Sequence, residues 1–140
     1  MEDKLILYPI FPLLALTCYV LFRTFFMRVA AVKSGAVSYK YYRLYDEGEE
    51  TPACRANTRH LANLLEIPPI FYITCILIYV TGINSILLLS CAWSFVLSRY
   101  LHTYVHLGRN KIRQRYLIFW AGGLILILMW VVSLMAIIRL

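Results

Sequence analysis

The stretch 67–98 contains no charged residue, and it constrains the fold more than any other feature of the sequence. A turn-like segment at 81–85, Thr-Gly-Ile-Asn-Ser, divides this stretch into two apolar pieces. Each piece would form a helix about 20 Å long at the helical rise of about 1.5 Å per residue, which is less than the roughly 30 Å hydrocarbon core of a bilayer. Both helices must therefore extend into neighbouring polar residues if they cross a membrane.

The composition is that of a membrane protein. Hydrophobic residues make up 61% of the chain and charged residues only 15%, and the mean hydropathy is +0.70. Four spans would use nearly all of the 140 residues, which leaves no room for a soluble catalytic domain. We therefore expect a single domain, residues 1–140, with an all-α fold: an integral membrane four-helix bundle. The expected spans are 5–33, 55–80, 85–107 and 114–138.

The formal net charge of +7 arises from cations that lie just outside the apolar runs or at their ends. This distribution is typical of orientation signals and lipid headgroup contacts, so nucleic acid is not expected as a partner. The two longer connections carry nearly all the Lys and Arg residues, whereas the ends of the chain and the 81–85 turn carry only Lys4 and Arg139. The positive-inside rule then places both connections in the cytoplasm and both termini on the opposite side.

The first connection combines a tyrosine cluster with the acidic run 46–50. Tyrosines are typical of the membrane interface, and we interpret the acidic run as a solvated loop. The apolar run before this connection lacks the basic flank of a cleavable signal, so we interpret it as a membrane anchor. The four cysteines show neither a CxxC spacing nor a histidine in register, and no metal site is expected.

A polar stripe precedes the first apolar piece. Arg59, Asn63 and Glu66 are spaced i, i+4 and i+7 and therefore lie on one face of a helix. The prolines at 68–69 are expected to kink this helix inside the membrane and to free backbone carbonyls near the stripe. A carboxylate at membrane depth is costly without a cation, so Glu66 either belongs to a functional site or pairs with Arg59 or Arg99 to tie helices together.

A second polar stripe follows the other apolar piece. Arg99, His102 and His106 are spaced i, i+3 and i+7, and the basic turn after them ends at Arg115. Because two helices joined by a short turn are antiparallel, we expect both stripes at a similar depth near the cytoplasmic face. Together with Arg115 they predict a cationic pocket that attracts a soluble, multiply anionic molecule, while the surrounding lipid supplies apolar ones.

Two motifs carry a resemblance to a known family. They are Arg59-xxx-Asn63-xx-Glu66 with a following proline, and Arg99-Tyr100-Leu101-His102-Thr103 with a basic turn ending at Arg115. With these motifs in the second and third of four spans, the chain resembles the membrane-associated proteins in eicosanoid and glutathione metabolism, the MAPEG family. The resemblance covers essentially the whole chain. The short, loop-poor layout is most similar to bacterial members that resemble microsomal glutathione S-transferases.

The resemblance implies a homotrimer of four-helix subunits in a bacterial inner membrane, with glutathione held as co-substrate between neighbouring protomers near the cytoplasmic face. It further implies a transferase or peroxidase that uses the glutathione thiolate to conjugate or reduce lipophilic electrophiles. Arg115 matches the arginine that stabilises this thiolate; the alternative is an orientation signal like Arg113. The glutathione-binding residues that the resemblance implies are Arg59, Asn63, Glu66, Arg99 and His102, and the pocket predicted from the second stripe adds His106.

The chain departs from the prostaglandin-synthase members of this family at three positions. His106 and Phe119 stand where those members have tyrosines, and Tyr116 stands where they have a serine. Prostaglandin synthesis is therefore not expected.

Other function classes remain open at this point. A non-catalytic lipid- or partner-binding protein of the same fold is the first alternative. Haem-based electron transfer through His60, His102 and His106 is the second, but His102 and His106 on one helix cannot both be axial ligands of the same haem. A channel or transporter is disfavoured because the sequence shows no internal repeat.

Overall fold

The computed structural model describes residues 3–45, 48–83, 85–108 and 111–138, and every regular element in this part of the chain is a helix. The elements are the 3-10 helix η1 (Asp3–Leu7) and the α-helices α1 (Ile10–Lys33), α2 (Tyr41–Leu44), α3 (Pro52–Glu66), α4 (Pro68–Val80), α5 (Ile86–Leu107) and α6 (Ile112–Ile138).

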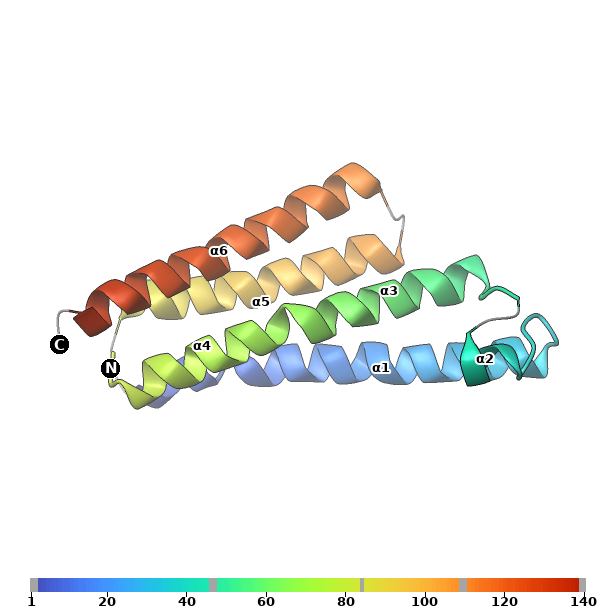
Figure 1. Cartoon of the computed structure of the whole chain (residues 1–140). Helices are drawn as coiled ribbons and strands as arrows, with labels where there is room; N and C mark the ends of the chain where they lie inside the picture. The colour runs from blue at the N-terminus through green and yellow to red at the C-terminus, as the bar shows by residue number, and fades with distance from the viewer. Residues whose placement is uncertain (1–2, 46–47, 84, 109–110, 139–140) are drawn as a thin grey trace.

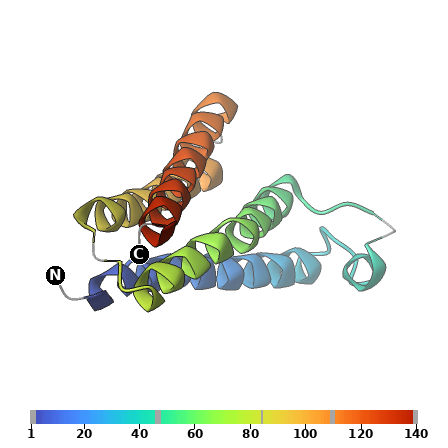
Figure 2. The ribbon, with the colours of Figure 1, turned by 60° about the vertical axis from the view of Figure 1, so that its left-hand side comes forward.

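The long helices lie side by side in an elongated bundle, with α5 between α6 and the α3–α4 pair (Figure 1). The passage from α4 to α5 lies at one end of the bundle. The passages from α1 to α3 and from α5 to α6 lie at the other end. Figure 2 shows α5 and α6 as a hairpin to one side of α1, α3 and α4.

Four helical stretches are long and apolar enough to cross a membrane: Lys4–Lys33, Pro52–Val80, Ile86–Leu107 and Ile112–Ile138. Large apolar side chains cover their outer faces; Phe22 and Trp120, for example, are 60% and 51% exposed. Such a surface suits lipid rather than water, and helices satisfy their own backbone hydrogen bonds in lipid. The expected all-α integral membrane four-helix fold is therefore confirmed.

Local sequence signals set the helix ends. The Thr51 and Ser85 side chains each accept a hydrogen bond from the backbone N–H three residues later, at 3.3 and 3.4 Å, and cap the N-termini of α3 and α5. Gly35 and Gly82 follow α1 and α4 with φ of +73° and +67°, a left-handed conformation that glycine adopts without strain. These residues fix where the second and third spans begin and where the first and second end.

The second span is interrupted at Ile67, between α3 and α4. Pro68 and Pro69 have no backbone N–H, so the carbonyls of residues 64 and 65 cannot receive the usual helical hydrogen bond. The interruption expected from the two prolines is thus confirmed. It falls directly after the last turn of α3, which carries the end of the first polar stripe.

The interior of the bundle has an apolar half and a polar half. Toward the α4–α5 end, Leu13, Phe71 and Phe95 are fully buried, and the two phenyl rings stack with centroids 4.6 Å apart. In the other half, the buried side chains of α3 and α5 include Asn57, His60, Arg99, His102, Thr103 and His106. Polar groups are costly to bury in a membrane span, so this half is where a functional site is expected.

The acidic run is partly built into the fold. Glu50 is only 6% exposed; the Arg28 Nε donates to its Oε1 at 3.0 Å, and the Thr58 hydroxyl donates to its Oε2 at 3.2 Å. The interpretation of this run as a solvated loop is therefore wrong for Glu50, because the carboxylate joins α1 to α3. It holds for Glu49, which is exposed, while residues 46–47 lie outside the described part of the chain.

Replacing Glu50 by glutamine is expected to destabilise the fold by about 1.5 to 3 kcal/mol, the usual contribution of a hydrogen bond to a charged group. Glu49→Gln is the matched control, because the Glu49 side chain is 81% exposed in its pair with Arg55 and surface pairs contribute little. Thermal unfolding of both variants in the same detergent measures the difference. Equal shifts in the two midpoints would contradict the structural role of Glu50.

Candidate functional site

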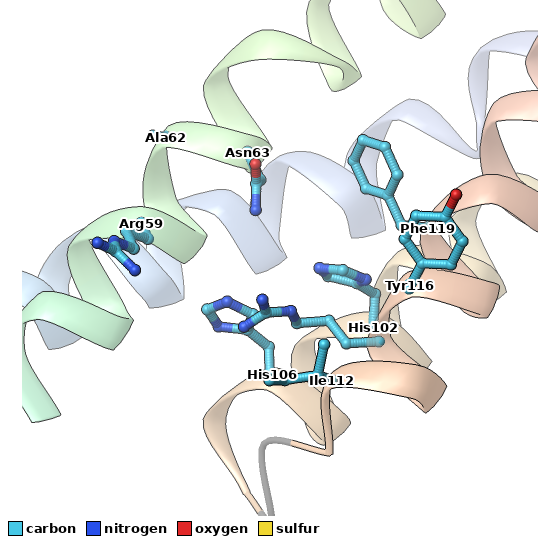
Figure 3. Close-up of a pocket in the computed structure, with 9 residues that line it drawn as sticks. Arg59, Ala62, Asn63, His102, His106, Ile112, Tyr116 and Phe119 are labelled. Atoms are coloured by element: carbon cyan, nitrogen blue, oxygen red, sulfur yellow. The ribbon is translucent and has the colours of Figure 1, made fainter.

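A cavity of about 410 Å³ opens between α3, α5 and α6, near the end of the bundle where α5 ends and α6 begins (Figure 3). In Figure 3, His102 and His106 extend from α5 into the space beside Arg59 and Asn63 of α3. The lining residues are Arg59, Ala62, Asn63, His102, His106, Ile112, Arg115, Tyr116 and Phe119.

The structure brings residues of both polar stripes together with the first turn of α6. Arg59 and Asn63 come from α3, His102 and His106 from α5, and Arg115 from α6. Arg59 is exposed at the rim, Asn63 and Arg115 are half-buried, and the two histidines are each 3% exposed. One side of the cavity is therefore cationic and rich in hydrogen-bonding groups.

The α6 side of the cavity is largely aromatic. Tyr116 and Phe119 line it, and the Phe119 ring lies 5.9 Å from the His102 ring, centroid to centroid. The sequence pattern marked these two positions only as departures from other family members, and it gave no signal for Ala62 and Ile112. The cavity thus places an apolar wall opposite a charged rim.

Arg99 does not line the cavity, although the second stripe predicted that it belongs to the site. It is 2% exposed, and its guanidinium lies 5.1 Å from the Phe95 centroid and 5.5 Å from the Phe119 centroid. The guanidinium Nη2 donates to the Phe119 carbonyl at 3.2 Å. Gly122 makes room for it, because a Cβ at that position would collide with the guanidinium. Arg99 therefore holds α6 against α5 behind the aromatic wall.

Glu66 also lies outside the cavity lining, exposed on the last turn of α3. Among the residues that the structure describes, it forms no ion pair with Arg59 or Arg99 within one chain, so the alternative of a pair that ties helices together finds no support there. Arg59 is two turns away, about 10 Å along the helix. Arg99 points toward α6 instead.

The orientation of α3 explains these differences. Its buried residues are Cys54, Asn57, His60 and Leu64, which lie beside the predicted stripe rather than on it. The spacing of Arg59, Asn63 and Glu66 predicts a shared face but not the direction in which that face points. In the single chain the stripe forms the outer edge of the site.

The spacing of the two polar stripes did not include His60. The sequence suggested this residue only as a haem ligand. It is completely buried, and its ring centroid lies 4.8 Å from that of His106 and 5.5 Å from that of His102. His60 Nε2 is 2.8 Å from Thr103 Oγ1. His60 is spaced three residues from Asn57 and four from Leu64, which are also buried, and this helical spacing was the available signal for a buried face. No group of three or more His, Cys, Asp or Glu within the described ranges is arranged to hold a metal ion.

The fold and the cavity define the class: an integral membrane protein of four helical spans with a cationic, histidine-containing cavity at one end. The sequence model of the MAPEG family matches residues 6–135, nearly the whole chain, and the chain belongs to this family, as its two motifs predicted. The comparisons with curated proteins and with solved structures give no match.

Proposed function

We propose that this protein is a membrane-bound glutathione-dependent transferase or peroxidase that acts on lipophilic electrophiles. The observation that carries this proposal is the cavity, in which cationic and amide groups face an aromatic wall. A soluble anionic thiol and an electrophile dissolved in lipid can meet there. Membership of the MAPEG family is consistent with this activity, and the family also contains non-catalytic members.

The lining residues suit the groups of glutathione, which carries two carboxylates, two peptide bonds and a thiol. Arg59 and Asn63 offer a cation and an amide to a carboxylate and a peptide group. Arg115 offers a cation to the thiol, and a neighbouring cation lowers the pKa of a thiol and raises the fraction of nucleophilic thiolate. Phe119 would then hold the electrophile against the sulfur.

We further propose a homotrimer in which a neighbouring copy completes the site. Glu66 is exposed in the single chain, and an ionised carboxylate at membrane depth is costly without a cation, which a second copy can supply. Ser90 and Ser94 are small and exposed on α5 and permit close helix approach, whereas Ala92 and Ser98 are buried within the chain. Crosslinking in native-like membranes tests this: a ladder ending at trimers supports it, and one ending at dimers contradicts it.

We place the cavity end of the bundle at the cytoplasmic side of a bacterial inner membrane. The connections at this end carry most of the cations, and the other end carries few. Both termini then lie on the non-cytoplasmic side, and the cavity opens toward the compartment that supplies glutathione.

One observation favours the alternative, non-catalytic lipid binding. A larger cavity of about 640 Å³ lies between α1 and α5, and aromatic and aliphatic side chains provide most of its lining, with Arg23 as its cation. Such a groove fits an acyl chain with an anionic head. The residues that line it are Ala15, Leu16, Tyr19, Arg23, Tyr100, Thr103, Tyr104, Leu107 and Gly108.

A small panel of ligands separates the two functions. Detergent-purified protein is titrated with glutathione, with cysteine and with a fatty acid, and turnover is then measured with glutathione and chlorodinitrobenzene. Saturable glutathione binding that weakens in Arg59→Ala, together with turnover, supports the transferase. Saturable fatty-acid binding that weakens in Arg23→Ala, without binding of either thiol, supports the alternative.

A further inference from the structure

Three buried histidines lie together beside the cavity. The ring centroids of His60, His102 and His106 are 4.8, 5.5 and 5.7 Å apart, and each residue is at most 3% exposed. His102 and His106 line the cavity, whereas His60 does not. The histidine cluster, defined by these three residues, therefore links the cavity to the interior of the bundle.

Hydrogen bonds assign the protonation of His60. The Thr103 hydroxyl donates its single proton to the Arg99 carbonyl at 2.8 Å. His60 Nε2, which lies 2.8 Å from the same Thr103 oxygen, must therefore be the donor in that contact. His60 Nδ1 then carries a lone pair, and this atom is buried without a hydrogen-bond partner in the protein. His60 is thus an anchored imidazole with an unused acceptor atom.

The other two rings also have unused nitrogen atoms. Both ring nitrogens of His102 and Nδ1 of His106 are buried without partners in the protein. Native structures pair nearly all buried polar atoms, so a group of unpaired imidazoles at a cavity indicates a function. The charged side chains that act on the cluster are cations: Arg23 from α1, Arg59 from α3, Arg99 from α5 and Arg115 from α6.

The cavity lining contains few groups that can accept a proton. Arginine remains protonated at all ordinary pH values, so Arg59 and Arg115 can stabilise a thiolate but cannot take the proton from the thiol. Asn63 and the apolar residues have no basic atom. A neutral imidazole has one ring nitrogen with a lone pair that can take up a proton, which leaves His102 and His106 as the bases among the lining residues.

We propose that the histidine cluster accepts the proton of the bound thiol, with His106 as the catalytic base and His60 as its positioning residue; this inference rests on the proposed glutathione-dependent function. The S–H bond breaks, its electron pair stays on sulfur, and the proton bonds to the lone pair of a His106 ring nitrogen. The imidazolium and the thiolate then balance each other in a site without a described carboxylate. His60, held by Thr103, packs against the charged ring.

The remaining steps of a conjugation balance without an added oxidant or reductant. The thiolate sulfur forms a bond to the electrophilic carbon, and the bond to the leaving group breaks, so that the leaving group departs with its electron pair. With chlorodinitrobenzene the leaving group is chloride. The proton on His106 passes to water at the mouth of the cavity, which restores the neutral cluster.

Proton counting tests the inference directly. Glutathione is added to the protein in weakly buffered detergent solution, the thiolate is measured by its ultraviolet absorbance, and released protons are measured with an indicator dye. The wild type is expected to release far fewer than one proton per thiolate, because the cluster keeps the proton. His106→Gln is expected to release close to one. Leu97→Ala, on the exposed side of the same helix and outside both cavities, is the control and should match the wild type.

The pH dependence of turnover provides a second measurement. It would not change if His106 and His60 had only a structural role. His106→Gln is expected to lower turnover with chlorodinitrobenzene about 10²-fold near neutral pH with glutathione affinity unchanged, and the deficit should shrink as rising pH ionises the thiol without help. Imidazole added to His106→Ala should restore turnover. His60→Gln should change the pH profile in the same direction with a loss of about tenfold.

The outcomes distinguish this inference from the proposed function. One proton released per thiolate by the wild type overturns the inference, as does an unchanged pH profile in His106→Gln; glutathione binding and turnover then leave the proposed function intact. Absence of saturable glutathione binding to the wild type overturns the proposed function and the inference together. If the His106 variants do not fold, the proton count of the wild type decides alone.

Discussion

Replacing Arg115 by alanine is expected to lower glutathione-dependent turnover about 10²- to 10³-fold while glutathione affinity changes only a few fold. Arg115 lines the cavity from the first turn of α6, on the same helix as Phe119. Its removal takes away a cation that favours the thiolate, so the pKa of the bound thiol should rise and the nucleophilic fraction at neutral pH should fall. Thiolate absorbance titrated against pH, in parallel with turnover, measures both effects.

Arg113→Ala is the matched control. Arg113 lies two residues earlier on α6, is exposed and does not line the cavity, so its removal should leave both the thiol pKa and turnover nearly unchanged. Equal behaviour of the two variants would reduce Arg115 to a membrane-orientation signal.

Arg115 and His106 would contribute to thiolate formation in different ways. A cation changes the free energy of the thiolate and therefore the pKa of the bound thiol, whereas a base changes where the proton goes. Arg115→Ala should thus move the titration midpoint and keep the low proton release of the wild type. His106→Gln should raise the proton release per thiolate. Two arginines on the cavity alone would stabilise the product of deprotonation, and the proton would then be released to the solvent.

Much of this site could be predicted from helical spacing. The two stripes place Arg59, Asn63, His102 and His106 on single faces, and a short turn between antiparallel helices brings those faces to the same level. The paired prolines likewise predict the interruption at Ile67, because a missing backbone N–H acts locally and independently of tertiary packing.

Spacing does not predict how a helix is rotated about its axis. The rotation of α3 is set by packing against α1 and α5, which buries His60 and leaves Glu66 at the surface. Arg99 illustrates a second limit, since a charge on a predicted polar face can be satisfied by aromatic rings and a carbonyl of the next helix instead of by a ligand. Such contacts join residues that are distant in sequence.

The contact of Arg99 with α6 leads to the second large expected effect, at Gly122. A Cβ at this position would collide with the Arg99 guanidinium and lie 2.6 Å from the Ser98 hydroxyl oxygen. Gly122→Ala is therefore expected to destabilise the protein by about 1 to 3 kcal/mol, the usual cost of overpacking. The expected loss of stability is opposite in sign to the effect of helix propensity alone, which favours alanine over glycine by about 1 kcal/mol. Thermal unfolding in detergent measures the change.

Gly123→Ala supplies the matched control, because no heavy atom lies within 4 Å of a Cβ built at Gly123. That variant should be as stable as the wild type or more so, through the gain in helix propensity. A double-mutant cycle then identifies the cause of the loss at Gly122. If the guanidinium is the obstacle, Gly122→Ala should cost much less in an Arg99→Ala background, since the two sites are in contact. An equal cost in both backgrounds would show that Arg99 does not limit the approach of α6 to α5.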